Sequence, residues 1–124
     1  MPGVSVLFFL TGACLALVGT IWGLHMGISE DHTLAAAHGH LNLVGFVGMS
    51  VFGAYYGLNR TAAEGRMAKV HFGLALISVI IFVVGLALVL SGEGNGLVKL
   101  GSVLVILNFA FFVLIVARNG LRRS

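Results

Sequence analysis

Residues 34–58 read LAAAHGHLNLVGFVGMSVFGAYYGL, an apolar run that contains no Asp, Glu, Lys or Arg. A helix needs about 20 mostly apolar residues to cross a bilayer, so this run is long enough to form one span. Three further runs meet the same requirement, at residues 4–27, 67–90 and 97–117. The sequence therefore predicts an all-α integral membrane protein with four transmembrane helices.

The composition of the whole chain supports a membrane protein. Of its 124 residues, 59% are hydrophobic and 9% are charged, and the mean hydropathy of +1.09 excludes a water-soluble globule. The connections at 28–33, 59–66 and 91–96 are short, so we expect antiparallel neighbours in one up-and-down domain covering residues 1–124. Four helices enclose little interior, and 18 glycines indicate close approach to another helix or a flat cofactor, so we also expect oligomers.

The charged residues predict the orientation of the chain. The end that holds the N-terminus also carries most of the basic residues: Arg60, Arg66, Lys69, Arg118, Arg122 and Arg123. The opposite end carries Lys99 together with Glu30, Asp31 and Glu93. By the positive-inside rule, both termini of this multi-pass protein face the cytoplasm, across the inner (cytoplasmic) membrane of a cell. Topology thus accounts for the pI near 9.6, and we expect no nucleic-acid partner.

Histidines are the polar residues in the spans that suggest chemistry. His38 and His40 open the second span near the outer face, His25 closes the first span, His32 lies in the loop between them, and His71 stands alone near the inner face. A two-residue step turns a helix by about 200°, so His38 and His40 should point to opposite flanks and serve two separate sites. Neutral imidazole is the usual axial ligand of a b-type haem, so the pair predicts haem b binding.

The glycines that follow this pair have two interpretations. Gly45, Gly48, Gly53 and Gly57, with phenylalanines between them, suit a helix grooved for a planar cofactor, and Gly45 is the nearest of them to the histidines. The alternative is plain helix packing, because 53–57 and 19–23 also fit the small-x-x-x-small pattern. The sequence leaves both open.

Residues 31–56, DHTLAAAHGHLNLVGFVGMSVFGAYY, resemble the tenth helix of the catalytic subunit of haem-copper oxidases and nitric oxide reductases. That helix carries an A-H-x-H motif followed by a glycine- and aromatic-rich run. The resemblance implies that His38 takes the place of the high-spin haem ligand and His40 that of the low-spin haem ligand. It also puts Asp31 at the place of an aspartate near the haem propionates and a non-redox metal.

The resemblance continues into residues 67–72, MAKVHF, which are similar to the K-[IV]-H-F start of the eleventh helix, and more weakly into Gly101 and Ser102. The family's histidine at the position of His71 is not a haem ligand. Residues 40 and 58 are also about 27 Å apart along a helix, so His71 should not share a haem with His40.

The chain corresponds to only one of the three four-helix arcs of that twelve-helix subunit, resembling helices nine to twelve. It lacks a His-His pair for a second metal, a tyrosine placed for cross-linking to a metal ligand, and a recognisable proton channel. The resemblance therefore implies a homotrimer in which His38 of one copy and His40 of the next ligate haem b in the pores between copies. The implied function is electron transfer or small-gas (O2 or NO) redox chemistry with a quinol or other redox donor. An electron-transfer protein is favoured over a full oxygen or NO reductase.

Two other arrangements remain open at this point. His25 could pair with His38 or His40 within one chain, because adjacent antiparallel helices place them at similar depth. Alternatively, the protein could be a haem-free transporter-like or assembly subunit in which His25, Asp31, His32 and His38 bind Zn or Cu.

Overall fold

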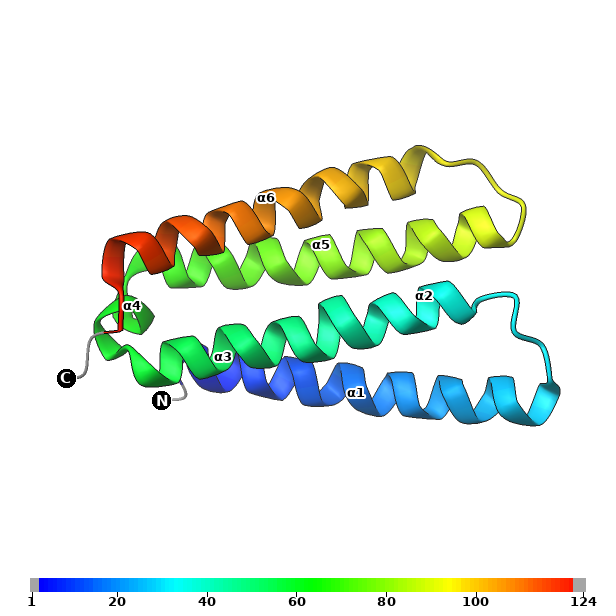
Figure 1. Cartoon of the computed structure of the whole chain (residues 1–124), viewed down its shortest axis with the longest axis horizontal. Helices are drawn as coiled ribbons and strands as arrows, with labels where there is room; N and C mark the ends of the chain where they lie inside the picture. Colours follow the sequence, from blue (N-terminus) through cyan, green and yellow to red (C-terminus); the bar gives the residue numbers. More distant parts are fainter. Residues whose placement is uncertain (1–2, 122–124) are drawn as a thin grey trace.

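A computed structural model describes residues 3–121, and these contain helices but no strands (Figure 1). The elements in chain order are α1 (Val4–Ser29), α2 (Ala35–His40), the π-helix η1 (Leu41–Val47), α3 (Gly48–Leu58), α4 (Arg60–Glu64), α5 (Arg66–Leu90) and α6 (Gly96–Asn119). The segments α2, η1 and α3 form one continuous second span. The described residues hold four helices that are long and apolar enough to cross a membrane, which confirms the predicted multi-pass membrane fold.

The spans run up and down, and both chain ends lie at the same end of the bundle (Figure 1). We call this the terminal end and the opposite end the distal end. The chain forms two hairpins, α1 with the second span and α5 with α6, and the second span also packs on α5. The terminal end carries the basic residues Arg60, Arg66, Lys69 and Arg118, as predicted. Arg122 and Arg123 lie outside the described residues.

The α5–α6 hairpin depends on two glycines. A Cβ atom on Gly85 would lie 2.5 Å from the backbone nitrogen of Val98, and one on Gly101 would lie 2.5 Å from the Cα atom of Phe82. Both distances are far below van der Waals contact, and the atoms that would be hit are backbone atoms. The two helices can therefore approach this closely only because neither position has a side chain.

Glycines also join α1 to the second span. Gly12 faces Ser50, Gly19 faces the side chain of Asn42, and Gly23 faces the ring of His38. Conversely, Gly53 of the second span lies against Phe8 and Phe9 of α1. Gly12, Gly19, Gly23 and Gly53 therefore take part in packing between α1 and the second span.

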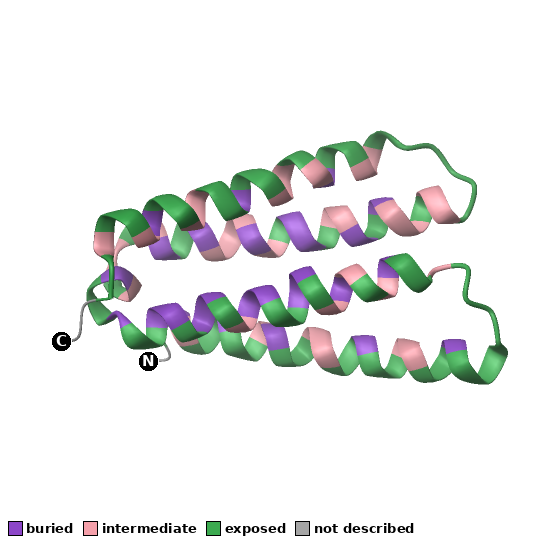
Figure 2. Cartoon of the chain, in the orientation of Figure 1, coloured by how far each residue is buried: buried purple, intermediate pink, exposed green. Residues whose placement is uncertain are grey.

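The buried residues lie where the spans face one another, and the outward surfaces are exposed and apolar (Figure 2). Leu10, Leu17, Ile21, Ile106 and Val113 are examples of large apolar side chains on those outward surfaces of α1 and α6. Such a surface suits hydrocarbon, in which every backbone polar group must find its partner within the helix. The second span is the most buried of the four, so it forms the centre of the bundle.

Two features were not predicted from the sequence. The 59–66 connection contains the short helix α4, whose start is capped by the Asn59 side chain accepting a hydrogen bond from the Ala62 amide at 3.0 Å. The second span changes to a π-helix directly after His40, and the Gly48 amide bonds back to the Leu43 carbonyl five residues earlier. A π turn shifts the register of every side chain that follows, and such turns are frequent at functional sites.

We predict that Gly85→Ala lowers the free energy of unfolding by about 1–3 kcal/mol or more, because the added methyl group collides with the α6 backbone. The measurement is reversible unfolding in mixed micelles, followed by circular dichroism. Gly73→Ala on the same helix is the control, because no described atom lies within 4 Å of its Cβ position. Equal destabilisation by the two substitutions would contradict the close α5–α6 contact.

Candidate functional site

His38 and His40 lie in α2 at the distal end, and their rings face different neighbours. The His38 ring packs edge-on against Trp22 of α1, with 5.7 Å between ring centroids. The His40 ring packs edge-on against Phe82 of α5, with 5.2 Å between ring centroids. The two rings therefore point to opposite flanks of the second span, as their two-residue spacing predicts.

The half-buried imidazole of His40 has the geometry of a metal ligand. Its Nδ1 atom lies 2.7 Å from the carbonyl oxygen of Ala36, one turn earlier. A carbonyl oxygen only accepts, so Nδ1 donates its hydrogen and Nε2 keeps a free lone pair. Metal-binding histidines usually hold the second ring nitrogen in this way, which fixes both the tautomer and the ring orientation. His40 is therefore held with its Nε2 atom free to bind a metal.

His38 is placed differently. Its Nε2 atom lies 3.4 Å from the Asn42 amide nitrogen, longer than the usual 2.7–3.2 Å of a strong hydrogen bond. The ring covers Gly23, where a Cβ atom would lie 3.3 Å from both Cε1 and Nε2. Its Nδ1 atom is buried and has no hydrogen-bond partner among the described residues. In this orientation Nε2 faces α1 and Asn42, so His38 can bind a metal only after its ring turns.

The residue between the two histidines, Gly39, lies on the exposed face of the second span. No described atom comes within 4 Å of its Cβ position, and the same face continues through the exposed side chains of Leu43, Phe46 and Val47. A flat apolar molecule can approach the backbone there. Gly45, which the sequence suggested for this role, is buried between Leu15 and Val79, so Gly39 is the accessible glycine.

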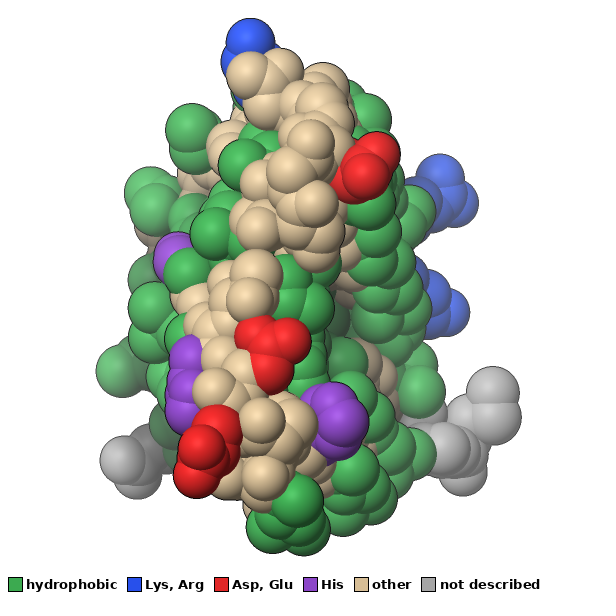
Figure 3. Space-filling model, turned by 90° about the vertical axis from the view of Figure 1, so that its right-hand side faces the viewer, with side chains coloured by type: hydrophobic (Ala, Val, Ile, Leu, Met, Phe, Trp, Pro, Cys, Tyr) green, Lys and Arg blue, Asp and Glu red, His purple; other side chains and the backbone are tan. Residues whose placement is uncertain are grey.

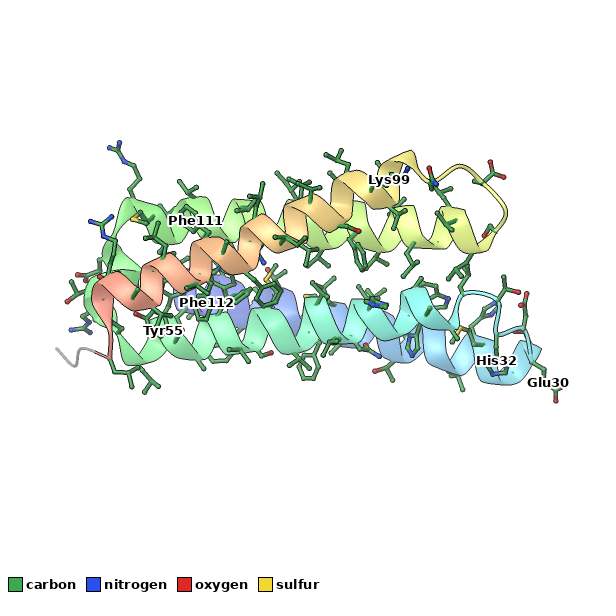
Figure 4. The ribbon with its side chains drawn as sticks, turned by 45° about the horizontal axis from the view of Figure 1, so that its top comes forward. Glu30, His32, Tyr55, Lys99, Phe111 and Phe112 are labelled. Carbon is green, nitrogen blue, oxygen red and sulfur yellow. The ribbon has the colours of Figure 1, made fainter. Side chains whose placement is uncertain are left out.

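The remaining distal residues do not form a metal site. Figure 3 shows acidic and histidine side chains spread over this end of the molecule, and Figure 4 shows Glu30 and His32 at its tip. Within residues 3–121, no three His, Cys, Asp or Glu side chains come together closely enough to hold a metal ion. His25, Asp31, His32 and His38 therefore do not form the predicted Zn or Cu cluster within the described residues.

Asp31 has a local structural role. Its Oδ1 atom accepts hydrogen bonds from the Thr33 hydroxyl at 2.6 Å and from the Thr33 backbone amide at 3.0 Å. These bonds stabilise the charged form and lower the pKa of the carboxyl group below its ordinary value. Asp31 also lines a small cavity of about 130 Å³ with His25 and Trp22. The aspartate thus shapes the loop before α2 and lies near the end of α1.

A larger apolar groove of about 410 Å³ lies between α1, η1 and α5. Its described lining includes Leu15, Trp22, Leu41 and Val83, and neither His38 nor His40 belongs to it. The groove thus adjoins the His38 flank through Trp22, which packs on the His38 ring.

His71 belongs to a buried polar group at the terminal end. It is 0% exposed, its Nδ1 atom lies 2.8 Å from the Tyr56 hydroxyl, and its ring stacks on Phe112. Asn108 of α6 is buried as well, and its amide has no hydrogen-bond partner among the described residues. Sequence reasoning did not single out Asn42, Tyr56 or Asn108, although polar residues inside apolar runs were a visible signal.

The chain matches no protein-family model, no curated protein and no solved structure. The candidate site therefore rests on the geometry of this chain and on its motifs.

We predict that Tyr56→Phe lowers the free energy of unfolding by about 1–3 kcal/mol, because it leaves the buried His71 nitrogen without a partner. Tyr55→Phe is the matched control and should cost less than about 1 kcal/mol. The Tyr55 hydroxyl donates to the Gly120 carbonyl, which also accepts from Asn59, so this carbonyl keeps a partner. Unfolding in mixed micelles gives both values, and a neutral Tyr56→Phe would show that the pair contributes nothing.

Proposed function

We propose that this chain is a haem b protein of the inner membrane that performs electron transfer or small-gas (O2 or NO) redox chemistry. The observation that carries the proposal is His40. It is an imidazole within a membrane span, its Nδ1 atom is 2.7 Å from the Ala36 carbonyl oxygen one turn earlier, and its Nε2 atom is left as a ligand. The accessible Gly39 beside it lets a flat molecule approach the helix. The resemblance of residues 31–56 to the A-H-x-H helix of haem-copper oxidases adds independent support.

Each residue of the proposed site would have its own role in haem binding. His40 would hold iron through Nε2, and the Ala36 carbonyl would keep its ring oriented and raise its basicity. Phe82 would limit the ring's rotation from the α5 side. His38 would provide the second imidazole after leaving Asn42. Haem b, when bound, supplies an iron that exchanges single electrons or, with one ligand absent, binds O2 or NO.

The two histidines of one chain favour assembly with other copies. Because the rings point to opposite flanks, they do not converge on one iron, and each needs a ligand from elsewhere. A homotrimer, with His38 of one copy opposite His40 of the next, provides that ligand and gives a twelve-helix ring like that of the oxidase family. The exposed face around Gly39, with Leu43, Phe46 and Val47, offers a surface of small and apolar residues for such contacts.

The charged residues predict the orientation of the chain in the membrane. Arg60, Lys69 and Arg118 at the terminal end would face the cytoplasm, and the histidines would lie near the outer face. A quinol or another redox donor would then deliver electrons to the haem. Electron transfer is favoured over a full reductase, because the sequence lacks the His-His pair that would bind a second metal in the oxidase family.

The first test is the visible spectrum of the protein purified from haem-replete cells, with its haem-to-chain ratio and its mass in detergent. We expect reduced α and β bands, one haem per chain and a trimer. His40→Ala should remove the haem, whereas His32→Ala, an exposed loop histidine, should retain it. A correctly folded but colourless wild-type protein would refute the proposal.

His25→Ala distinguishes the two ligation geometries. We expect it to keep full haem content, because His25 lines a separate small cavity with Trp22 and Asp31. Loss of haem from His25→Ala, with its circular dichroism unchanged, would instead support pairing within one chain.

Carbon monoxide distinguishes the two kinds of chemistry. For two imidazoles on the iron, we expect no shift of the Soret band when CO is added to the reduced protein, as an electron-transfer site requires. A shifted Soret band would mean that one position binds gases.

A further inference from the structure

A polar cavity lies at the terminal end, away from the histidine pair. It has a volume of about 430 Å³ and lies between α4, the start of α5 and the end of α6. Figure 1 shows α4 close to these two helix ends. The polar and charged residues in its lining are Thr61, Arg66, Arg118 and Asn119.

The charge of this cavity is positive. Arg66 and Arg118 both line it, and the described lining contains no carboxylate. The Arg118 guanidinium has one Nη1 contact at 3.5 Å with the Met67 sulfur, which is only a weak acceptor. Both arginines are exposed, so their remaining donors are available to a ligand. A guanidinium presents a planar fork of donors that matches the oxygens of a phosphate.

The start of α5 adds to this positive character. Gly65, which also lines the cavity, is the N-cap of this 25-residue helix and provides no side-chain cap, and the first turn of α5 contains no acidic residue. Backbone amides at a helix start lack partners within the helix, and the helix dipole favours an anion there. The neighbouring helix α4 is different, because the Asn59 side chain already caps it.

The remaining lining indicates which kind of anion fits. Met67, Ala62 and the buried Ile115 form an apolar side to the cavity, next to the two arginines. The cavity also lies at the ends of the spans α5 and α6, where lipid headgroups meet hydrocarbon. A ligand with a phosphate joined to an apolar chain matches both parts, whereas a free phosphate matches only the arginines.

From these observations we propose that the cavity binds the phosphate of an anionic phospholipid in the leaflet at the terminal end. Arg66 and Arg118 hold the phosphate, the start of α5 contributes amide donors, and the half-buried Met67 contacts the beginning of the acyl region. This site does not depend on haem binding, so either proposal can fail without the other.

The experiment compares Arg66→Gln/Arg118→Gln with the control Arg60→Gln/Lys69→Gln. Both double variants lose two positive charges at the terminal end, but Arg60 and Lys69 lie outside the cavity lining. Native mass spectrometry of delipidated protein in detergent measures the binding of phosphatidylglycerol against phosphatidylcholine. A parallel titration with inorganic phosphate tests for displacement of the bound lipid. Circular dichroism of each variant confirms that the helices are retained.

We expect the wild-type protein and the control to bind phosphatidylglycerol similarly, within about threefold. The Arg66/Arg118 variant should bind it at least about tenfold more weakly, because two charge-assisted hydrogen-bonding groups are lost. Equal loss in both double variants, or equal binding of the two lipids by wild type, would overturn the proposal. Displacement of the lipid by inorganic phosphate at equal concentration would overturn the assignment to a lipid and indicate a soluble anion.

Discussion

Polar side chains of the second span lie against glycines of α1, and much of the structure depends on this contact. Asn42 covers Gly19, His38 covers Gly23, and Ser50 faces Gly12. Inside a membrane, water cannot solvate such groups, so they must lie against backbone or other polar atoms. Because these positions of α1 are glycines, polar side chains of the second span can pack against them. This packing fixes the rotation of each helix about its own axis relative to the other.

This rotation makes the two histidines of α2 unequal. His38 is turned onto α1, where its ring fills the space over Gly23, and Asn42 lies beside its Nε2 atom. His40 faces α5, and the Ala36 carbonyl of the same helix holds its Nδ1 atom. The π-helix begins at the next residue and places Asn42 and Gly45 against α1. His40 thus keeps a free Nε2 atom, whereas the ring of His38 is held in a helix–helix contact.

The core at the terminal end consists mainly of aromatic side chains. Aromatic rings from α1, α3 and α6 surround His71. Figure 4 shows Tyr55, Phe111 and Phe112 grouped at this end. Beyond this core, α4 and the ends of α5 and α6 frame the arginine-lined cavity. A core of aromatic rings around the buried His71 therefore lies between the distal histidines and the basic surface of the terminal end.

The sequence by itself determined the four spans, because the length and hydropathy of each run leave no other fold in a bilayer. It also determined that His38 and His40 point to opposite flanks, since helical periodicity alone sets that angle. Helical periodicity could not predict which ring nitrogen of His40 or His38 has a polar partner, because that depends on the Ala36 carbonyl and on Asn42. Nor could it assign Gly45 to packing and Gly39 to the surface. The first outcome depends on the orientation of each ring against Trp22 of α1 or Phe82 of α5, and the second on the distance between helices; only the tertiary structure decides either.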